Sequence, residues 1–118
     1  MDAFRVNLAA LKNEGGSASA TVDLGARRRF LAWGSVTMVD PLTDFDRDNA
    51  VVLDIFTVDG ALTANRVFGG DHWGPEGSGD NVFDGALVGF GQRVNFWLRS
   101  LHSADLDSFG VGIVLVLD

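Results

Sequence analysis

An unbroken alternation of apolar and polar residues runs through positions 17–24, SASATVDL. Every second residue is small or apolar, and the residues between them carry hydroxyl or carboxylate groups. A period of two is the period of a β-strand with one buried face, because successive side chains point to opposite sides of a sheet. The stretch therefore predicts a half-buried strand in which Val22 and Leu24 face the core.

The acidic residues are almost all aspartates, with 14 Asp and only two Glu, Glu14 and Glu76. Aspartate favours turns and loops, where its short side chain bonds nearby backbone groups, whereas glutamate favours helices. The 15 glycines are spread along the chain and there are only two prolines. This composition indicates a protein of strands and turns.

The N-terminal stretch FRVNLAAL fits two kinds of element. Phe4, Val6 and Leu8 alternate as in a strand, while Phe4, Leu8 and Leu11 also share one face of a helix. Because the rest of the chain is strand-like, we favour a strand over residues 2–14 and keep a helix as the alternative.

The tetrapeptide Val58-Asp59-Gly60-Ala61 predicts a two-residue hairpin turn, because Asp-Gly readily adopts positive φ. If Val58 pairs with Ala61, Asp54 lies opposite Asn65. The same register places Arg66 among the apolar residues of the core face.

Further strands are expected after Gly25 up to about residue 39, with Gly34 as a candidate bulge, and at about 82–90 and 93–101. The last stretch, SFGVGIVLVLD, is apolar at nearly every position. It predicts a central strand covered on both faces.

About eight short strands with glycine-marked turns predict an all-β fold in a single domain over residues 1–118. An antiparallel β-sandwich of the jelly-roll kind is the first choice, and a small closed β-barrel is the second.

Charge and composition exclude several classes of function. A net charge of −7 disfavours nucleic acid as a partner, because nucleic-acid binding needs a positive surface. The cluster 27–29, with Arg47, is best explained as solubilising charge on a strand edge, with an anion contact as the alternative. The absence of cysteine excludes a disulfide framework, a zinc–thiolate site and a cysteine nucleophile.

No signal peptide and no transmembrane stretch is apparent, so we expect no membrane insertion and, by default, a cytoplasmic protein. A protein secreted after processing, or exported without a signal, would have the same sequence features.

An acidic loop at positions 40–49 is a candidate calcium site. Its carboxylates are Asp40, Asp44, Asp46 and Asp48, and the last three have the spacing that opens an EF-hand loop. Asn49 and Ile55 occupy the positions where that motif needs glycine and glutamate, so the loop is not an EF-hand. A solvated loop of aspartate turns is the favoured interpretation, and a Ca²⁺ site on a sandwich loop is the alternative.

The glycine-rich stretch at 69–81 is the candidate ligand site. A sugar needs an aromatic platform for its CH face and planar polar groups for its hydroxyls, and this loop contains both kinds of group. The candidate ligand-binding residues are Asp71, His72, Trp73, Glu76, Asp80 and Asn81. The alternative is that Trp73 closes one end of the core.

Two fragments, WGPEG at 73–77 and GALV at 85–88, resemble pieces of calcium-dependent galactose-binding bacterial lectins. They cover under a tenth of the chain, and the calcium-ligand stretch of that family has no clear counterpart here. The resemblance implies a class of binding protein without assigning the family.

Catalytic arrangements have weaker support. His72, and His102 near Asp105 and Asp107, would have to converge from separate loops to hold a metal. A Ser-His-Asp triad lacks a nucleophile elbow, and a pair formed by Glu76 with Asp71 or Asp80 would need a deep cleft. We therefore expect no enzyme activity.

Self-association is the other functional signal. Both faces of residues 51–58 are largely apolar, and Trp97 points away from the face of Phe96 and its apolar neighbours. The residues thus favour a lectin-like carbohydrate-binding module, with a glycan or other polar small ligand as partner. A self-assembling homo-oligomer subunit is the close alternative, and a small hydrolase is third.

Overall fold

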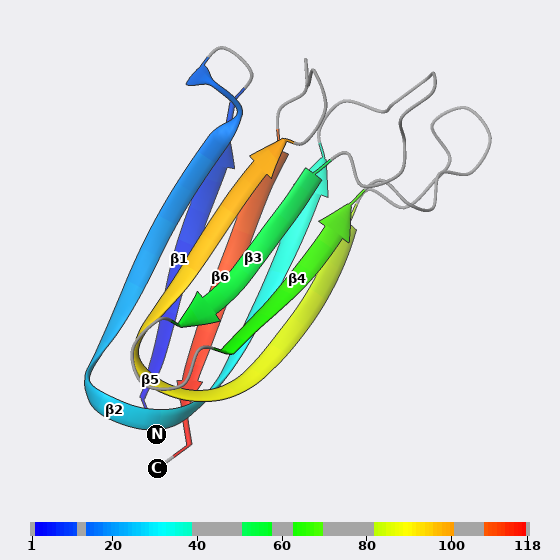
Figure 1. Ribbon diagram of the computed structural model, residues 1–118. Helices are drawn as coiled ribbons and strands as arrows, with labels where there is room; N and C mark the ends of the chain where they lie inside the picture. Colours follow the sequence, from blue (N-terminus) through cyan, green and yellow to red (C-terminus); the bar gives the residue numbers. More distant parts are fainter. Residues whose placement is uncertain are drawn as a thin grey trace.

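The computed structural model describes residues 2–11, 14–38, 51–57, 63–69, 82–100 and 108–117, which form one antiparallel sheet (Figure 1). Its six strands are β1 (Ala3–Ala10), β2 (Ser17–Met38), β3 (Val51–Thr57), β4 (Thr63–Gly69), β5 (Val82–Ser100) and β6 (Ser108–Val116). Across the sheet they follow the order β1-β6-β2-β5-β3-β4. The described residues contain no α-helix. The prediction of an all-β antiparallel fold is confirmed.

Two long strands, β2 and β5, bend the sheet back over itself (Figure 1). Residues 17–23 of β2 pair with 93–99 of β5, the register shifts between Asp23 and Arg28, and pairing resumes between 28–37 and 82–91. Gly25 lies at this bend with a φ of 81°, a conformation that favours glycine, and its N–H donates to Asp23 Oδ1 at 2.8 Å.

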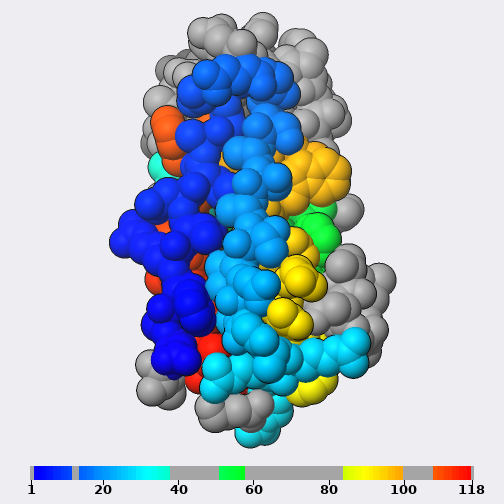
Figure 2. All heavy atoms as spheres, turned by 90° about the vertical axis from the view of Figure 1, so that its left-hand side faces the viewer, coloured from blue at the N-terminus to red at the C-terminus, as the bar shows by residue number. Residues whose placement is uncertain are grey.

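The bend divides the sheet into two halves that face each other. The β6 half contains β1, β6, residues 28–38 of β2 and residues 82–91 of β5. The β3 half contains residues 17–23 of β2, residues 93–100 of β5, β3 and β4. Along one side of the molecule, β1 and the first part of β2 lie side by side (Figure 2).

The core lies between the two halves, and glycines of the β6 half make room for large side chains of the β3 half. A Cβ at Gly112 would lie 2.6 Å from the Phe96 ring, and one at Gly34 would lie 2.6 Å from the Leu53 side chain. Such contacts are far closer than van der Waals packing permits, so glycine is required by the approach of the two halves. Phe30, Phe96, Leu53, Ile55 and Leu98 are among the fully buried side chains.

Several local predictions are confirmed. Residues 3–10 form a strand rather than a helix. In the alternating stretch 17–24, Val22 and Leu24 are buried in the core, while Ala18 and Ala20 pack partly against it. The alternation therefore predicted the correct side of the sheet for this segment.

The predicted hairpin register is wrong. Asp54 pairs with Arg66, not Asn65, and the last described pair, Thr57 with Thr63, encloses five residues rather than a two-residue turn. The observed register is thus shifted by one position from the predicted one. The Asp-Gly turn itself lies outside the described residues.

Three other predictions need correction. Gly34 is not a bulge, because it pairs regularly with Gly85 and Gly112, and the irregularity lies between Asp23 and Arg28. The segments 82–90 and 93–101 belong to one strand, and the segment 17–24 continues into the strand predicted after Gly25, so the described strands number six rather than eight. β6 is an inner strand, as predicted, but its outer face is only partly covered, since Phe109 is 43% exposed.

Candidate functional site

The two predicted loop sites lie outside the described residues and stay predictions. These are the candidate calcium ligands Asp40, Asp44, Asp46 and Asp48 and the candidate ligand-binding residues Asp71, His72, Trp73, Glu76, Asp80 and Asn81. His102, Asp105 and Asp107 also lie outside them. In the part of the chain that the structure describes, no three acidic or histidine side chains form a group suited to a metal ion. No described helix is long and apolar enough to cross a membrane.

The outer face of the β6 half is a candidate interaction surface, which we call the apolar face. It is made by every second residue of four neighbouring strand segments, on the side opposite the core. Its apolar members are Ala3, Ala9, Leu31, Trp33, Ala86, Val88, Phe90, Phe109, Val111, Ile113, Leu115 and Leu117. Val88 is 68% exposed and Phe90 is 47% exposed, so large hydrophobic side chains meet solvent here.

The apolar residues are continuous across the strands. Ala3 pairs with Leu115, Leu115 with Leu31, and Leu31 with Val88, which makes one row from β1 to β5. Directly paired side chains on one face of a sheet are close enough to touch. The face is therefore one patch rather than scattered residues.

Three charged residues stand on this face, namely Arg5 on β1, Asp84 on β5, and Arg29 on β2, where it pairs with Phe90 near the bend. Arg5 stands on the edge strand β1, and its Nε donates to Asn7 Oδ1 at 3.4 Å. Asp84 stands on β5, where its Oδ2 accepts from Trp33 Nε1 at 3.2 Å. Around the row of Trp33, the apolar face is thus positive on the β1 side and negative on the β5 side.

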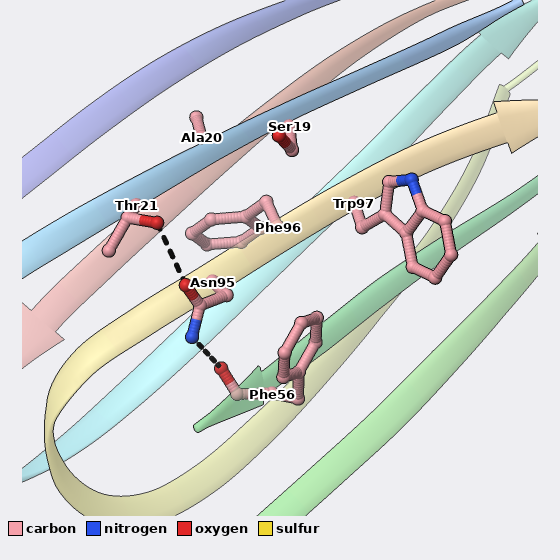
Figure 3. A pocket seen from close by; sticks show the side chains of 7 residues that line it. All are labelled: Ser19, Ala20, Thr21, Phe56, Asn95, Phe96 and Trp97. Atoms are coloured by element: carbon pink, nitrogen blue, oxygen red, sulfur yellow. Dashed lines mark hydrogen bonds between the residues drawn. The ribbon is translucent and has the colours of Figure 1, made fainter. Parts of the chain in front are cut away.

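The outer face of the β3 half, which we call the polar face, has the opposite character. Its described members are Ser17, Ser19, Thr21, Asp23, Arg93, Asn95, Trp97, Arg99, Val52, Asp54 and Phe56. It carries a small hollow of about 250 Å³, lined by Ser19, Ala20, Thr21, Phe56, Asn95, Phe96 and Trp97 (Figure 3). This volume is slightly below that of ordinary small-molecule sites.

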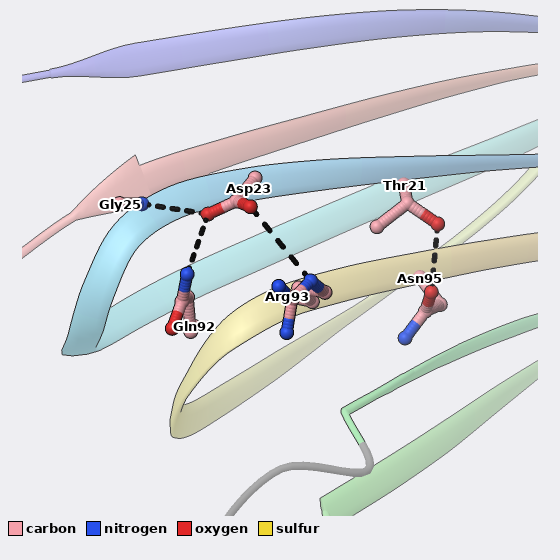
Figure 4. Close-up of polar contacts among 6 residues, drawn as sticks. All are labelled: Thr21, Asp23, Gly25, Gln92, Arg93 and Asn95. Atoms are coloured by element: carbon pink, nitrogen blue, oxygen red, sulfur yellow. Dashed lines mark hydrogen bonds and ion pairs between the residues drawn. The ribbon is translucent and has the colours of Figure 1, made fainter.

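Asn95 at the hollow is held by two neighbouring strands. Thr21 Oγ1 donates to Asn95 Oδ1 at 2.8 Å, and Asn95 Nδ2 donates to the Phe56 carbonyl at 3.4 Å (Figure 3). Close to the bend, Asp23 accepts from Gln92 Nε2 at 3.1 Å and forms an ion pair with Arg93 at 3.7 Å (Figure 4). The polar side chains of this face are therefore fixed by one another.

Trp97 and Arg99 form a second polar cluster with Asp54. The Arg99 guanidinium lies 3.8 Å from the centroid of the Trp97 ring, and its Nη1 donates to Asp54 Oδ2 at 3.1 Å. Trp97 Nε1 donates to Ser17 Oγ at 3.2 Å. Asp54 stands on this outer face, yet it is only 8% exposed and its carboxylate is paired with Arg99.

The orientation of Trp97 was predicted correctly, since it is 39% exposed while Phe96 is fully buried. The sequence did not single out Val88 and Phe90, because its alternation there does not show which face is covered. Arg99 was missed as the partner of Asp54, because 45 residues separate the two in the chain.

Comparison with known proteins shows the fold alone. No family model matches the chain, and no curated protein sequence matches it. Its structure is similar to the pre-peptidase C-terminal domain of a collagenase from Bacillus anthracis, with a TM-score of 0.52 and 4% identity over 93% of this chain and 87% of that one.

The chain is also similar to the VP2 subviral particle of infectious bursal disease virus, with a TM-score of 0.53 and 13% identity. The match covers 98% of this chain but only 33% of the viral chain. Both similarities support a sandwich-like all-β module.

Proposed function

We propose that this chain is a non-catalytic β module that assembles with a second copy of itself through the apolar face. The observation that carries the proposal is the continuous apolar patch across four strand segments, in which Val88 is 68% exposed, Phe90 47%, Phe109 43% and Leu117 41%. Exposed apolar patches of this extent are typical of interaction surfaces, because covering them removes apolar area from water.

The size of the apolar face supports an interface between copies. Four strands at about 4.8 Å spacing and eight residues at about 3.4 Å give a footprint of roughly 500 Å². Two such surfaces bury about 1,000 Å² when they pack together, which reaches the lower limit for a specific complex. The similar fold found in a subviral particle supports the proposal.

Face-to-face packing suits the chemistry of this surface. The apolar side chains stand on a sheet, and sheets stack through interdigitated side chains at about 10 Å. The overall fold that we propose is accordingly a β-sandwich rather than a closed barrel. In the described residues β1 and β4 are the two ends of the strand order, and no pairing joins them.

The test is the mass of the protein in solution. Light scattering over a range of micromolar concentrations should give more than one chain per particle for the wild type, and a single chain for Val88→Asp. A matched control is Ser19→Asp, which adds the same charge at an exposed strand position of the polar face. We expect Ser19→Asp to associate like the wild type. If the wild type is still a monomer at the highest protein concentration, about 100 µM, the proposal is contradicted.

A lectin-like carbohydrate site is the second candidate. The loop residues Asp71, Trp73 and Asn81 have the composition of a sugar site, and calcium at Asp44 and Asp46 would be an accessory to it. The observation in its favour is the hollow, where Trp97 lies beside the Asn95 amide and the Thr21 hydroxyl.

A panel of neutral sugars distinguishes the two locations. Binding at the loop should be lost in Trp73→Ala and kept in Trp97→Ala, and binding at the hollow should show the reverse. A rise in melting temperature with CaCl₂ that EDTA removes, and that Asp46→Ala abolishes, would support the calcium site. Absence of both effects would leave assembly as the only proposed function.

A further inference from the structure

We infer that two copies pack their apolar faces about a two-fold axis that runs roughly along the strands, between β6 and β2, with Arg5 of each copy against Asp84 of the other. This inference rests on the proposed assembly through the same face, and it adds the orientation of the partner. Three observations carry it: the strand order, the position of the two charges, and the direction in which each side chain leans.

The strand order determines which strands of the two copies lie over each other. On the apolar face the strands run β1, β6, β2, β5, so a two-fold axis between β6 and β2 exchanges the two sides of the patch. The β1 strand of one copy then lies over the β5 strand of the other, and β6 lies over β2. Positions at the same height along the strands meet, because this rotation leaves height unchanged.

The register gives the heights of the two charges. Arg5 pairs with Ile113, which pairs with Trp33, and Trp33 pairs with Ala86, so these residues form one row. In the next row, Asn7 pairs with Val111, Val111 pairs with Ser35, and Ser35 pairs with Asp84. Arg5 and Asp84 are therefore one row apart, a distance that an arginine side chain spans.

Each charged side chain already leans toward the other's row. Arg5 Nε donates to Asn7 Oδ1 at 3.4 Å, which draws the guanidinium toward the row of Asp84. Trp33 Nε1 donates to Asp84 Oδ2 at 3.2 Å, which draws the carboxylate toward the row of Arg5. Across the interface the two groups approach from opposite sheets, and the two-fold axis creates this contact twice.

The alternative axis, perpendicular to the strands, places β1 over β1 and β5 over β5. It leaves Arg5 and Asp84 on opposite sides of the interface, so these two charges do not meet each other. Charges at the rim of an interface set orientation by favouring complementary contacts and opposing like ones. The charge pattern thus selects the axis along the strands.

Charge reversal tests this arrangement. Arg5→Asp should raise the dissociation constant of the homodimer roughly tenfold or more, because it places two carboxylates together at both contacts. Asp84→Arg should do the same with two guanidinium groups. The double variant should recover the affinity of the wild type, and Arg93→Asp on the polar face should leave it unchanged.

Mixing the two single variants is the sharpest measurement. A heterodimer of Arg5→Asp with Asp84→Arg restores an opposite-charge pair at both contacts, so the mixture should associate more tightly than either variant alone. Analytical ultracentrifugation of the two variants, separately and mixed, measures this directly. Asp84→Asn, which keeps an acceptor for Trp33, checks that the loss comes from charge.

The outcomes separate the two proposals. If the wild type associates but neither reversal nor mixing changes the dissociation constant, the two-fold arrangement is overturned and assembly through the apolar face stands. If the wild type does not associate at all, both fall.

Discussion

The two outer faces of the same sheet differ in whether their side chains find partners within the chain. On the polar face, Asp54 is paired with Arg99 and Asn95 is bonded by two strands. On the apolar face, Val88 is 68% exposed. Because the exposed side chains of the apolar face are hydrophobic, packing against a second molecule would remove them from water.

The long strand β5 contributes to both faces, which makes the contrast direct. Before the bend its outward residues are Asp84, Ala86, Val88 and Phe90, and after it they are Arg93, Asn95, Trp97 and Arg99. Substitutions on the polar face should therefore change the stability of the fold, while those on the apolar face should change association. All stabilities below refer to a Val88→Asp background, so that association does not contribute.

Asp54→Ala should have the largest effect. It leaves Arg99 without its carboxylate partner, in side chains that are only 20% and 12% exposed. Breaking a largely buried pair on one side costs about 3 kcal/mol of unfolding free energy, measurable by urea denaturation. Asp84→Ala, on the exposed apolar face, is the control and should cost less than about 1 kcal/mol. Equal losses at both positions would remove the difference between the faces.

Asn95→Ala should come next. It removes the acceptor of Thr21 and the donor to the Phe56 carbonyl, so the expected loss is about 1–2 kcal/mol by the same measurement. The matched variant on the other face is Asn7→Ala, which loses one exposed contact with Arg5. We expect a change below about 0.5 kcal/mol there. A larger loss for Asn7→Ala would show that the apolar face also contributes to folding.

Arg93→Ala sharpens the comparison within the polar face. Its ion pair with Asp23 is 3.7 Å long, and both side chains are about half exposed, at 55% and 51%. Water and salt screen such a pair, so the stability should fall by less than about 1 kcal/mol and by even less in 1 M salt (a Debye length of about 3 Å). A loss as large as that of Asp54→Ala would mean that burial does not determine how much these ion pairs contribute to the free energy of unfolding.

Phe90→Ser should have the smallest effect on the fold and a clear effect on assembly. Phe90 is 47% exposed on the apolar face, so its removal should change the unfolding free energy by less than about 0.5 kcal/mol. In a chain with Val88 intact, the same substitution should shift the mass measured by light scattering toward the monomer. Retained association would place the interface elsewhere.

Local patterns determined which side of the sheet most described residues take. The alternation in 17–24 places Val22 and Leu24 in the core, and the opposite orientations of Phe96 and Trp97 were read from their neighbours. This works because the side-chain period of a strand is set by backbone geometry within a few residues. The all-β class followed in the same way from alternation, glycine-marked turns and the excess of aspartate.

The tertiary structure decided everything that depends on distant strands. The contact of Asp54 with Arg99 follows from the pairing of β3 with β5. The exposure of Val88 follows from the bend at Gly25, which lays one half of the sheet over the other and turns the opposite face of Val88's segment toward the core. The alternation of side chains shows which residues share a face of the strand. It does not show whether that face is buried, because the segments that pack against it lie far away in the chain. For this reason the sequence alone determined the all-β class and the alternation within a strand, and only the folded sheet showed which apolar face is exposed.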